Sequence, residues 1–262
     1  MKAIRFTIFS ILFGLLVLVI ACKKETNPAA APQMGSKISV TGQDAGTGLK
    51  TAIMGQTTAW IATSDKVGIY SPEARTATAG GGTAIVNAEF TAATSAASST
   101  FSGTMYWGAA NTSHTFYAYY PYTAGSAAST VVPVSLPAAQ TQSAANSGIG
   151  ALDFLVATPT TVTSPSSLDG NPVGSSAVSL SYNHLFTVLE FQIKGTGALK
   201  AIKLVGTDNP VAFSGGTIDI TQIPPATGVA FTIANQTGTT TQAVVTLTSA
   251  ATLSATNTDT KV

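Results

Sequence analysis

The stretch that decides the fold is Thr115–Pro121, with the sequence TFYAYYP. Side chains alternate between the two faces of an extended chain, so this stretch carries aromatic rings on both faces. Rings of this size bury a large apolar area, which predicts a β-strand with at least one face in the core. The alternative is a surface platform on which the tyrosines stack against sugar rings.

Further short runs alternate in the same way along the rest of the chain. No long window has the 3.6-residue apolar period of a helix, and Gly, Pro, Ser and Thr recur too often for long helices. Many short strands separated by turn residues predict an all-β fold of antiparallel sandwiches. The further runs are Thr130–Leu136, Ala177–Lys194, Ile202–Leu204, Ile218–Ile220 and Ala243–Leu247.

Composition narrows the class of protein. The chain has 262 residues, of which 45% are hydrophobic and 9% are charged. Its 12 Lys and Arg against 11 Asp and Glu give +1, and loss of Lys2 and Arg5 with a leader would give −1. This near-zero charge excludes the basic surface of a nucleic-acid-binding protein. The apolar content excludes a highly charged disordered chain, so we expect a folded protein with a weakly charged surface.

The N-terminus has the pattern of an export signal. Lys2 and Arg5 precede an apolar run of 13 residues, Ile8–Ile20. As a helix this run would span about 20 Å, short of the roughly 30 Å of a bilayer core. The pattern predicts a signal peptide over residues 1–21, and a short transmembrane anchor is the alternative.

The residues that follow, Val19-Ile20-Ala21-Cys22, resemble a bacterial lipobox. The resemblance implies cleavage between Ala21 and Cys22 and lipidation of Cys22 on its sulfur and its new amino terminus. Several acyl chains would bind a membrane far more firmly than one. Because Cys22 is the only cysteine, no internal disulfide can form, and packing and hydrogen bonds must hold the fold.

Turn-rich segments divide the mature chain. Residues 22–48 have the composition of a tether, although Lys37–Thr41 within it alternates like a strand, with an unstructured linker as the alternative. Prolines and glycines crowd residues 158–176. We therefore expect an N-terminal sandwich over 49–175 and a partial C-terminal sandwich over 176–262, or else one larger sandwich with a long loop. The 86 residues after the boundary are few for a sandwich, so a fragment or shortened variant is expected.

No motif of catalysis or cofactor binding stands out. Gly80–Gly82 leads into a strand-like run and not into the helix that a phosphate-binding loop requires. His114 and His184 lack metal-ligand spacing, and the 11 carboxylates form no tight pair. We expect no enzyme activity, cofactor or metal. Trp107 and Tyr122 are the candidates for surface aromatic binding of a glycan.

Several short segments follow one another along the chain, and each alone is weak evidence of a family. They are Trp60, Asp65–Tyr70, Tyr106–Trp107, Phe116–Tyr122, Val134–Pro137 with Gln140, Asp153–Ala157, His184–Phe186 and Leu189–Phe191. Together, behind a lipobox, they resemble the fimbrillin family of surface lipoproteins from Bacteroidetes, which includes major and accessory pilins.

The resemblance implies tandem antiparallel β-sandwich domains, transthyretin-like or Greek-key, and a role in adhesion as a fimbrial subunit. It implies export to the outer membrane by the lipid anchor, proteolytic removal of an N-terminal strand, and strand exchange with other fimbrial subunits. An opened sheet has unpaired backbone groups and an apolar groove, and an added strand satisfies both. Lys37–Thr41, or the segment near Ile53, is the strand expected to be removed.

The processing site departs from the family pattern. Arg75 is the only arginine after the signal peptide and follows the first family motif, so no arginine stands where an arginine-specific protease would cut. Lys37 and Lys50 are the candidates for a lysine-directed cut. The alternative is an uncut, lipid-anchored surface protein that binds a host or glycan receptor without polymerising.

Overall fold

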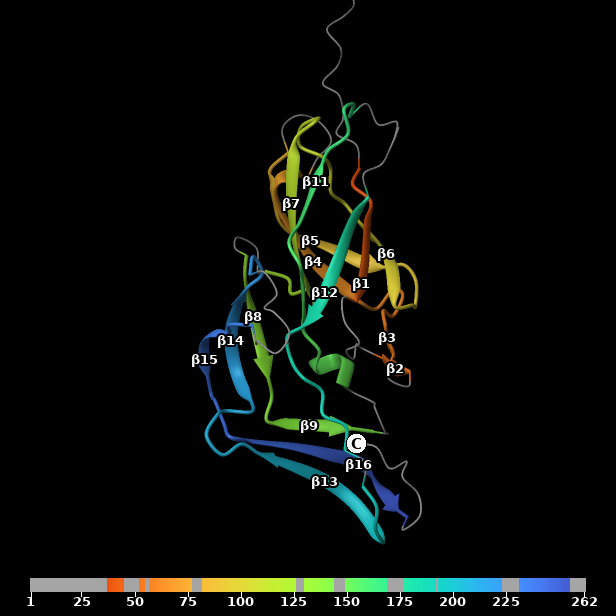
Figure 1. Cartoon of the computed structure of the whole chain (residues 1–262), viewed down its shortest axis with the longest axis vertical. Helices are drawn as coiled ribbons and strands as arrows, with labels where there is room; N and C mark the ends of the chain where they lie inside the picture. Colours follow the sequence, from red (N-terminus) through yellow and green to blue (C-terminus); the bar gives the residue numbers. More distant parts are fainter. Residues whose placement is uncertain are drawn as a thin grey trace, which may run out of the picture. The chain divides into compact units, whose positions relative to one another are not determined.

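The computed structural model describes residues 37–44, 52–54, 57–76, 82–125, 130–143, 149–168, 177–191, 193–222 and 231–254. Within these residues the regular structure is strand, apart from one 3-10 turn, η1 (Ile149–Leu152) (Figure 1). The predicted all-β fold is confirmed. No helix in the described part of the chain has the length and apolarity needed to cross a bilayer.

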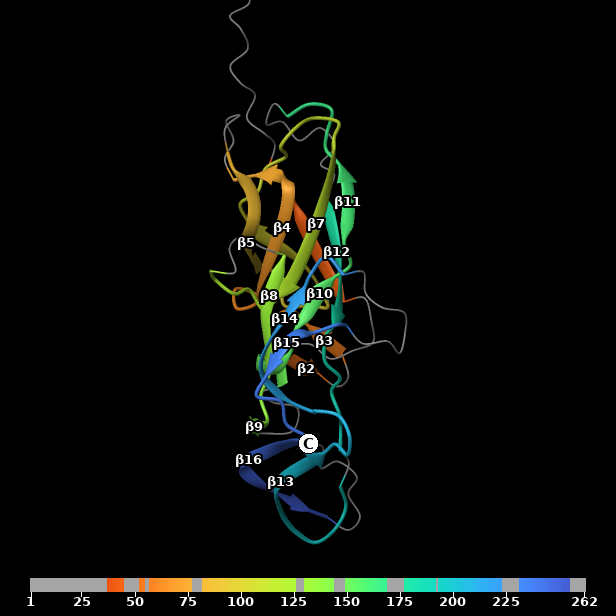
Figure 2. The ribbon, with the colours of Figure 1, turned by 90° about the vertical axis from the view of Figure 1, so that its left-hand side faces the viewer.

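The largest sheet has eight strands in the order β10-β12-β1-β6-β5-β4-β7-β11. Because β10 also pairs with β7, seven of these strands close into a hydrogen-bonded ring. The eighth strand, β11, pairs with the first half of β7 in antiparallel and is not part of the ring. Figure 2 shows β5, β4 and β7 side by side on the wall of this ring. The strands are β1 (Val40–Asp44), β4 (Lys66–Arg75), β5 (Ala84–Ala92), β6 (Ser98–Gly103), β7 (Ser113–Tyr120), β10 (Leu155–Ala157), β11 (Thr160–Thr163) and β12 (Val178–His184).

The aromatic stretch that predicts a strand is β7, and it is buried on both faces. Phe116, Ala118 and Tyr120 belong to one apolar cluster, whereas Tyr119 belongs to a second cluster. The first cluster is centred on Trp60, whose fully buried ring makes edge-to-face contacts with Phe101, Tyr120 and Tyr182 at centroid distances of 5.0, 5.7 and 5.2 Å. The expectation that at least one face lies in the core is confirmed.

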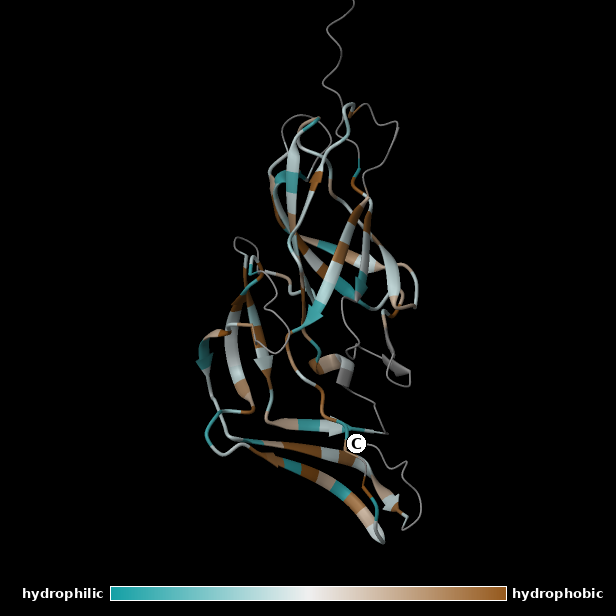
Figure 3. Ribbon diagram, viewed as in Figure 1, coloured by the Kyte–Doolittle hydropathy of each residue, from teal (hydrophilic) through white to brown (hydrophobic). Residues whose placement is uncertain are grey.

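Three smaller sheets complete the described fold, with orders β13-β16-β9, β15-β14-β8 and β2-β3. Hydrophobic residues predominate along β13 and are interrupted by hydrophilic ones, as Figure 3 shows. The strands are β2 (Ala52–Met54), β3 (Thr57–Ala59), β8 (Val131–Leu136), β9 (Ala139–Gln142), β13 (Gly197–Val205), β14 (Phe213–Asp219), β15 (Ala234–Thr237) and β16 (Gln242–Leu253).

The predicted run Ala177–Lys194 is only partly strand. Its first part forms β12, but the chain leaves the sheet after His184, and Leu189 is 51% exposed. β12 pairs with β1 and β10, which both precede the predicted domain boundary. Residues 169–176, where the boundary falls, lie outside the described residues, and the division into 49–175 and 176–262 stays a prediction.

We expect Trp60→Ala to lower the free energy of unfolding by about 3–5 kcal/mol, because it leaves a cavity beneath three aromatic rings. The neighbouring Ile61 is 38% exposed, so Ile61→Ala should change stability by well under half of that amount. Urea denaturation of the purified variants measures both. Equal losses in the two variants would contradict the central place of Trp60 in the core.

Candidate functional site

The candidate site is the position of β1 between β6 and β12, which we call the β1 slot (Figure 1). β1 pairs with β12 in parallel over Val40–Asp44 and with β6 in antiparallel over Val40–Gln43. Two backbone bonds extend the pairing, from Ile38 N to the Met105 carbonyl and from Val178 N to the Ser39 carbonyl, at 2.8 and 2.9 Å. A strand is therefore present in the predicted tether, at Val40–Asp44 and not at Lys37–Thr41, and it is one of the seven strands of the ring.

The side chains of this segment alternate between the core and the surface. Ile38 and Val40 are 3% and 1% exposed and belong to the cluster around Trp60. Ser39 and Gln43 face outward and are exposed. Removing the strand would expose this apolar cluster and leave both β6 and β12 with unpaired backbone groups. Such an opening is an acceptor for another extended strand.

The two lysine candidates differ in what a cut would release. Lys37 is exposed and forms an isolated bridge with Tyr106. Lys50 lies outside the described residues, as do Ala21 and Cys22. Because β1 ends at Asp44, a cut after Lys37 would leave β1 covalently joined to the strands that follow it. A cut after Lys50 would break that covalent link.

Arg75 is bound into the end of β4. Its Nη1 donates to the carbonyls of Pro72, Glu73 and Ala74 at 3.0, 2.9 and 2.9 Å. Its backbone N–H and carbonyl both pair with Tyr106. A protease needs the scissile segment in its own active site, so β4 would have to unpair before cleavage. This geometry disfavours processing at Arg75 in the folded protein.

Trp107 is not on the surface, so the expectation that it binds a glycan is wrong. Its side chain is 3% exposed and packs edge-on against His114 and Phe116, at centroid distances of 4.9 and 5.8 Å. The residue lies between β6 and β7, outside any alternating run that would have marked its inward direction. Tyr122 is half-buried, and its N–H donates to the Lys66 carbonyl at 2.8 Å.

A groove of about 500 Å³ is lined by Pro121 and Thr123, the two sequence neighbours of Tyr122. Tyr122 itself is not among its lining residues. Its lining mixes hydroxyl groups, prolines, backbone and one carboxylate. The remaining lining residues are Pro133, Val134, Ser135, Pro137, Ala151, Leu152, Asp153, Phe154, Ser214, Gly215 and Gly216. A polar groove with few large apolar side chains suits a hydroxyl-rich ligand better than an apolar one.

The polar side chains in the core hold the fold together. His114 is fully buried, and its Nε2 accepts from the Gly108 N–H at 3.0 Å, so the ring proton lies on Nδ1 and faces the Thr112 carbonyl at 3.1 Å. Tyr120 donates to Asp65 at 3.2 Å, and burial together with that carboxylate raises the pKa of Tyr120. His184 pairs with Asp153 at 2.8 Å.

The two histidines make hydrogen bonds within the fold. No group of three or more His, Cys, Asp or Glu side chains comes together among the residues that the structure describes. His114 hydrogen-bonds to backbone groups, and His184, the last residue of β12, hydrogen-bonds to the carboxylate of Asp153. These contacts position loops and strand ends.

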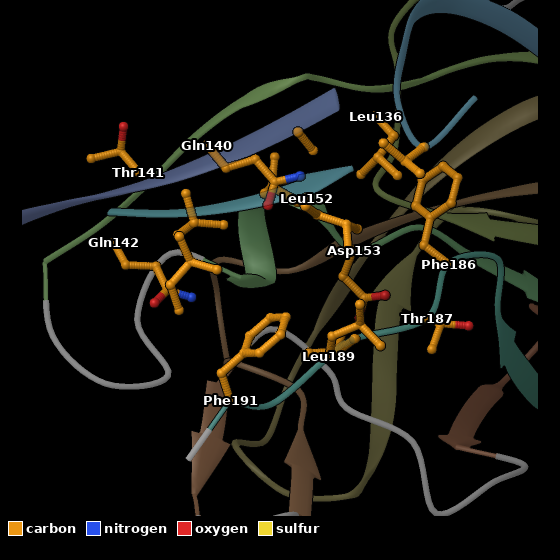
Figure 4. A pocket seen from close by; sticks show the side chains of 16 residues that line it. Leu136, Gln140, Thr141, Gln142, Leu152, Asp153, Phe186, Thr187, Leu189 and Phe191 are labelled. Atoms are coloured by element: carbon orange, nitrogen blue, oxygen red, sulfur yellow. The ribbon is translucent and has the colours of Figure 1, made fainter. Parts of the chain in front are cut away.

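An apolar pocket of about 160 Å³ lies between the β13-β16-β9 sheet and the segment that follows β12 (Figure 4). Phe186, Leu189 and Phe191 point into it from that segment, and Ile202 and Leu204 come from β13. The apolar residues that follow His184 therefore line this pocket, although they are no longer part of β12. The polar lining residues of the pocket are Gln140, Thr141, Gln142, Asp153 and Thr187.

Sequence comparison gives a family. A model described as fimbrillin-like matches residues 51–262. The chain belongs to the fimbrillin-like family. This confirms the resemblance to the fimbrillin family found in the sequence.

Two crystal structures also match this fimbrillin-like chain. A candidate cell adhesion protein from Bacteroides uniformis shares 20% identity, with 81% of this chain and 74% of that chain covered at a TM-score of 0.46. One from Bacteroides ovatus shares 16% identity, with 81% and 72% covered at a TM-score of 0.42. Comparison with curated proteins gave no match.

We expect an arginine-specific protease to leave the folded protein intact at Arg75 and to cut it after denaturation. The denatured protein is the internal control, because unfolding removes the strand pairing that covers Arg75. Mass spectrometry of the digests measures both. Rapid native cleavage at Arg75 would contradict the protection that we attribute to β4.

Proposed function

We propose that this fimbrillin-like protein is a structural or accessory subunit of cell-surface fimbriae, exported as a lipoprotein and assembled by β-strand exchange, with a role in adhesion. The observation that carries the proposal is β1, an N-terminal strand paired on both edges and packed into the core. Removing it would create an acceptor groove in an otherwise closed ring.

With β1 in place, the ring itself has no open strand edge for another subunit to pair with. Unpaired strand edges are templates for association, and each strand of the ring already has a neighbour on both sides. Loss of β1 would open two edges at once and expose the side of the core that Ile38 and Val40 cover. The groove would then bind an added strand through backbone hydrogen bonds and apolar contacts together.

One cut after Lys50 would couple two events. It would break the covalent link between β1 and the other strands of the ring, and once β1 leaves its slot those strands would no longer be attached to Cys22, the proposed lipid attachment site. The subunit would lose its outer-membrane anchor at the moment when its groove becomes available. A cut after Lys37 would release the anchor but leave β1 attached, so Lys50 is the site that we favour.

A second candidate function is glycan binding by a lipid-anchored protein that does not polymerise. The groove beside Tyr122 supports it, since Thr123, Ser135 and Ser214 supply hydroxyl groups there. Tyr122 is half-buried and continues the aromatic stretch beyond β7. This candidate needs no cut and no exchange.

For the fimbrial function, we expect mature protein from cells to form a ladder of heat-resistant oligomers that start at Thr51. Lys50→Ala should remain monomeric and start at Cys22, because β1 stays linked. Lys37→Ala is the matched control and should leave the ladder unchanged. Immunoblotting and N-terminal sequencing measure these outcomes, and a wild-type protein found only as a monomer starting at Cys22 would refute polymerisation.

For the second candidate, we expect binding on a glycan array that Tyr122→Ala reduces at least about tenfold, a loss of about 1.4 kcal/mol, because the variant removes an aromatic ring that offers a sugar both an apolar face and a polar hydroxyl group. Tyr106→Ala removes another half-buried tyrosine, one that is not a sequence neighbour of any residue lining the groove. It should bind as the wild type does. A wild-type protein without specific binding would exclude this candidate.

A further inference from the structure

We infer that the β1 slot selects its strand by glycine at the third inward position. The inference rests on the proposed strand exchange and specifies the partner, an extended segment with the pattern aliphatic-x-aliphatic-x-Gly. In β1 and the residues before it, these inward positions are Ile38, Val40 and Gly42, all of them buried. The residues between them face outward, so the pattern leaves those positions open to polar side chains.

Two rings occupy the space above Gly42. A Cβ atom placed on Gly42 would lie 2.5 Å from Cε2 of Phe101 and 2.9 Å from Cε2 of Tyr182. Both distances are far below van der Waals contact, which is about 3.5–4.0 Å between carbons. The two rings come from the two strands that flank the slot, Phe101 from β6 and Tyr182 from β12.

The rings reach Gly42 diagonally across the sheet. Phe101 lies opposite Val40 and Tyr182 opposite Asp44, each two residues from the position opposite Gly42. Large rings commonly reach such diagonal neighbours. The side-chain space at Gly42 is therefore filled from both sides by residues that belong to the acceptor and not to the strand.

The two rings cannot easily move away. Trp60 packs edge-on against both, at centroid distances of 5.0 Å to Phe101 and 5.2 Å to Tyr182. The three side chains are 0%, 6% and 0% exposed. Protein interiors are close-packed, so a side chain added at Gly42 would have to displace the centre of the core.

The need for glycine is one of space and not of backbone conformation. Gly42 is an ordinary β1 residue paired with both Leu180 and Ser99, and it is not among the glycines with positive φ. A strand with any other residue at this position could still form the backbone ladder. The acceptor would discriminate by the side chain alone.

The test uses the full mature chain with a site for a sequence-specific protease in place of residues 45–49, cut after folding so that β1 stays bound but unlinked. The probe is a fluorescent peptide of residues 37–44, added in excess, and its entry is followed by gel filtration and anisotropy. We expect the Gly42→Val peptide to enter at least about tenfold less than the wild-type peptide, because overpacking a core is costly. The Gln43→Val peptide is the matched control at an exposed position and should enter normally.

The outcomes separate this inference from the proposed function. Entry of the wild-type and Gln43→Val peptides, with exclusion of the Gly42→Val peptide, supports both. Equal entry of all three overturns the glycine requirement and leaves strand exchange in place. Failure of the wild-type peptide to enter overturns strand exchange, and the requirement falls with it.

Discussion

The two-sided pairing of β1 is the constraint on which the rest of the structure depends. β6 and β12 each need a partner along the edge that faces the other, and β1 supplies both. Without it, the ring of strands would have two open edges and the cluster around Trp60 would face solvent. A buried backbone group without a partner costs about as much as a lost hydrogen bond, and several such groups would be left along each edge.

Packing around Trp60 makes this constraint mutual. Phe101 and Tyr182 belong to the strands that hold β1, and both rest on Trp60. The same rings fill the space over Gly42. The strand therefore keeps the rings covered, and the rings determine which strand fits. A core built in this way can be stable while occupied and open when one strand leaves, since no disulfide ties the strand in place.

The sequence predicts the strands well and their faces less well. Period-two alternation identified β7, β8, β13 and β16, because side-chain direction along one strand is a local property. The burial of Trp107 cannot be predicted in this way, because Trp107 lies in the connection between β6 and β7 and not in an alternating strand. Its side chain is buried by contacts with His114 and Phe116. The need for glycine at position 42 cannot be predicted from its neighbours in sequence, because the two rings that crowd it, Phe101 and Tyr182, belong to distant strands. The apolar residues after β12, such as Phe186 and Phe191, line a pocket and do not belong to a sheet.

The sequence position of β1 is what makes exchange physically reasonable. Its neighbours in space are β6 and β12, so no hairpin joins it to either of them. β5 and β6, by contrast, follow each other in the chain and pair directly, and one could not leave without unfolding the other. A strand held only by non-local contacts forms after the entropy of closing a long loop has been overcome. Once the chain is cut beyond Asp44, that linkage no longer favours the strand's own chain over a strand from another subunit, and the choice is left to backbone pairing and to the fit at Gly42.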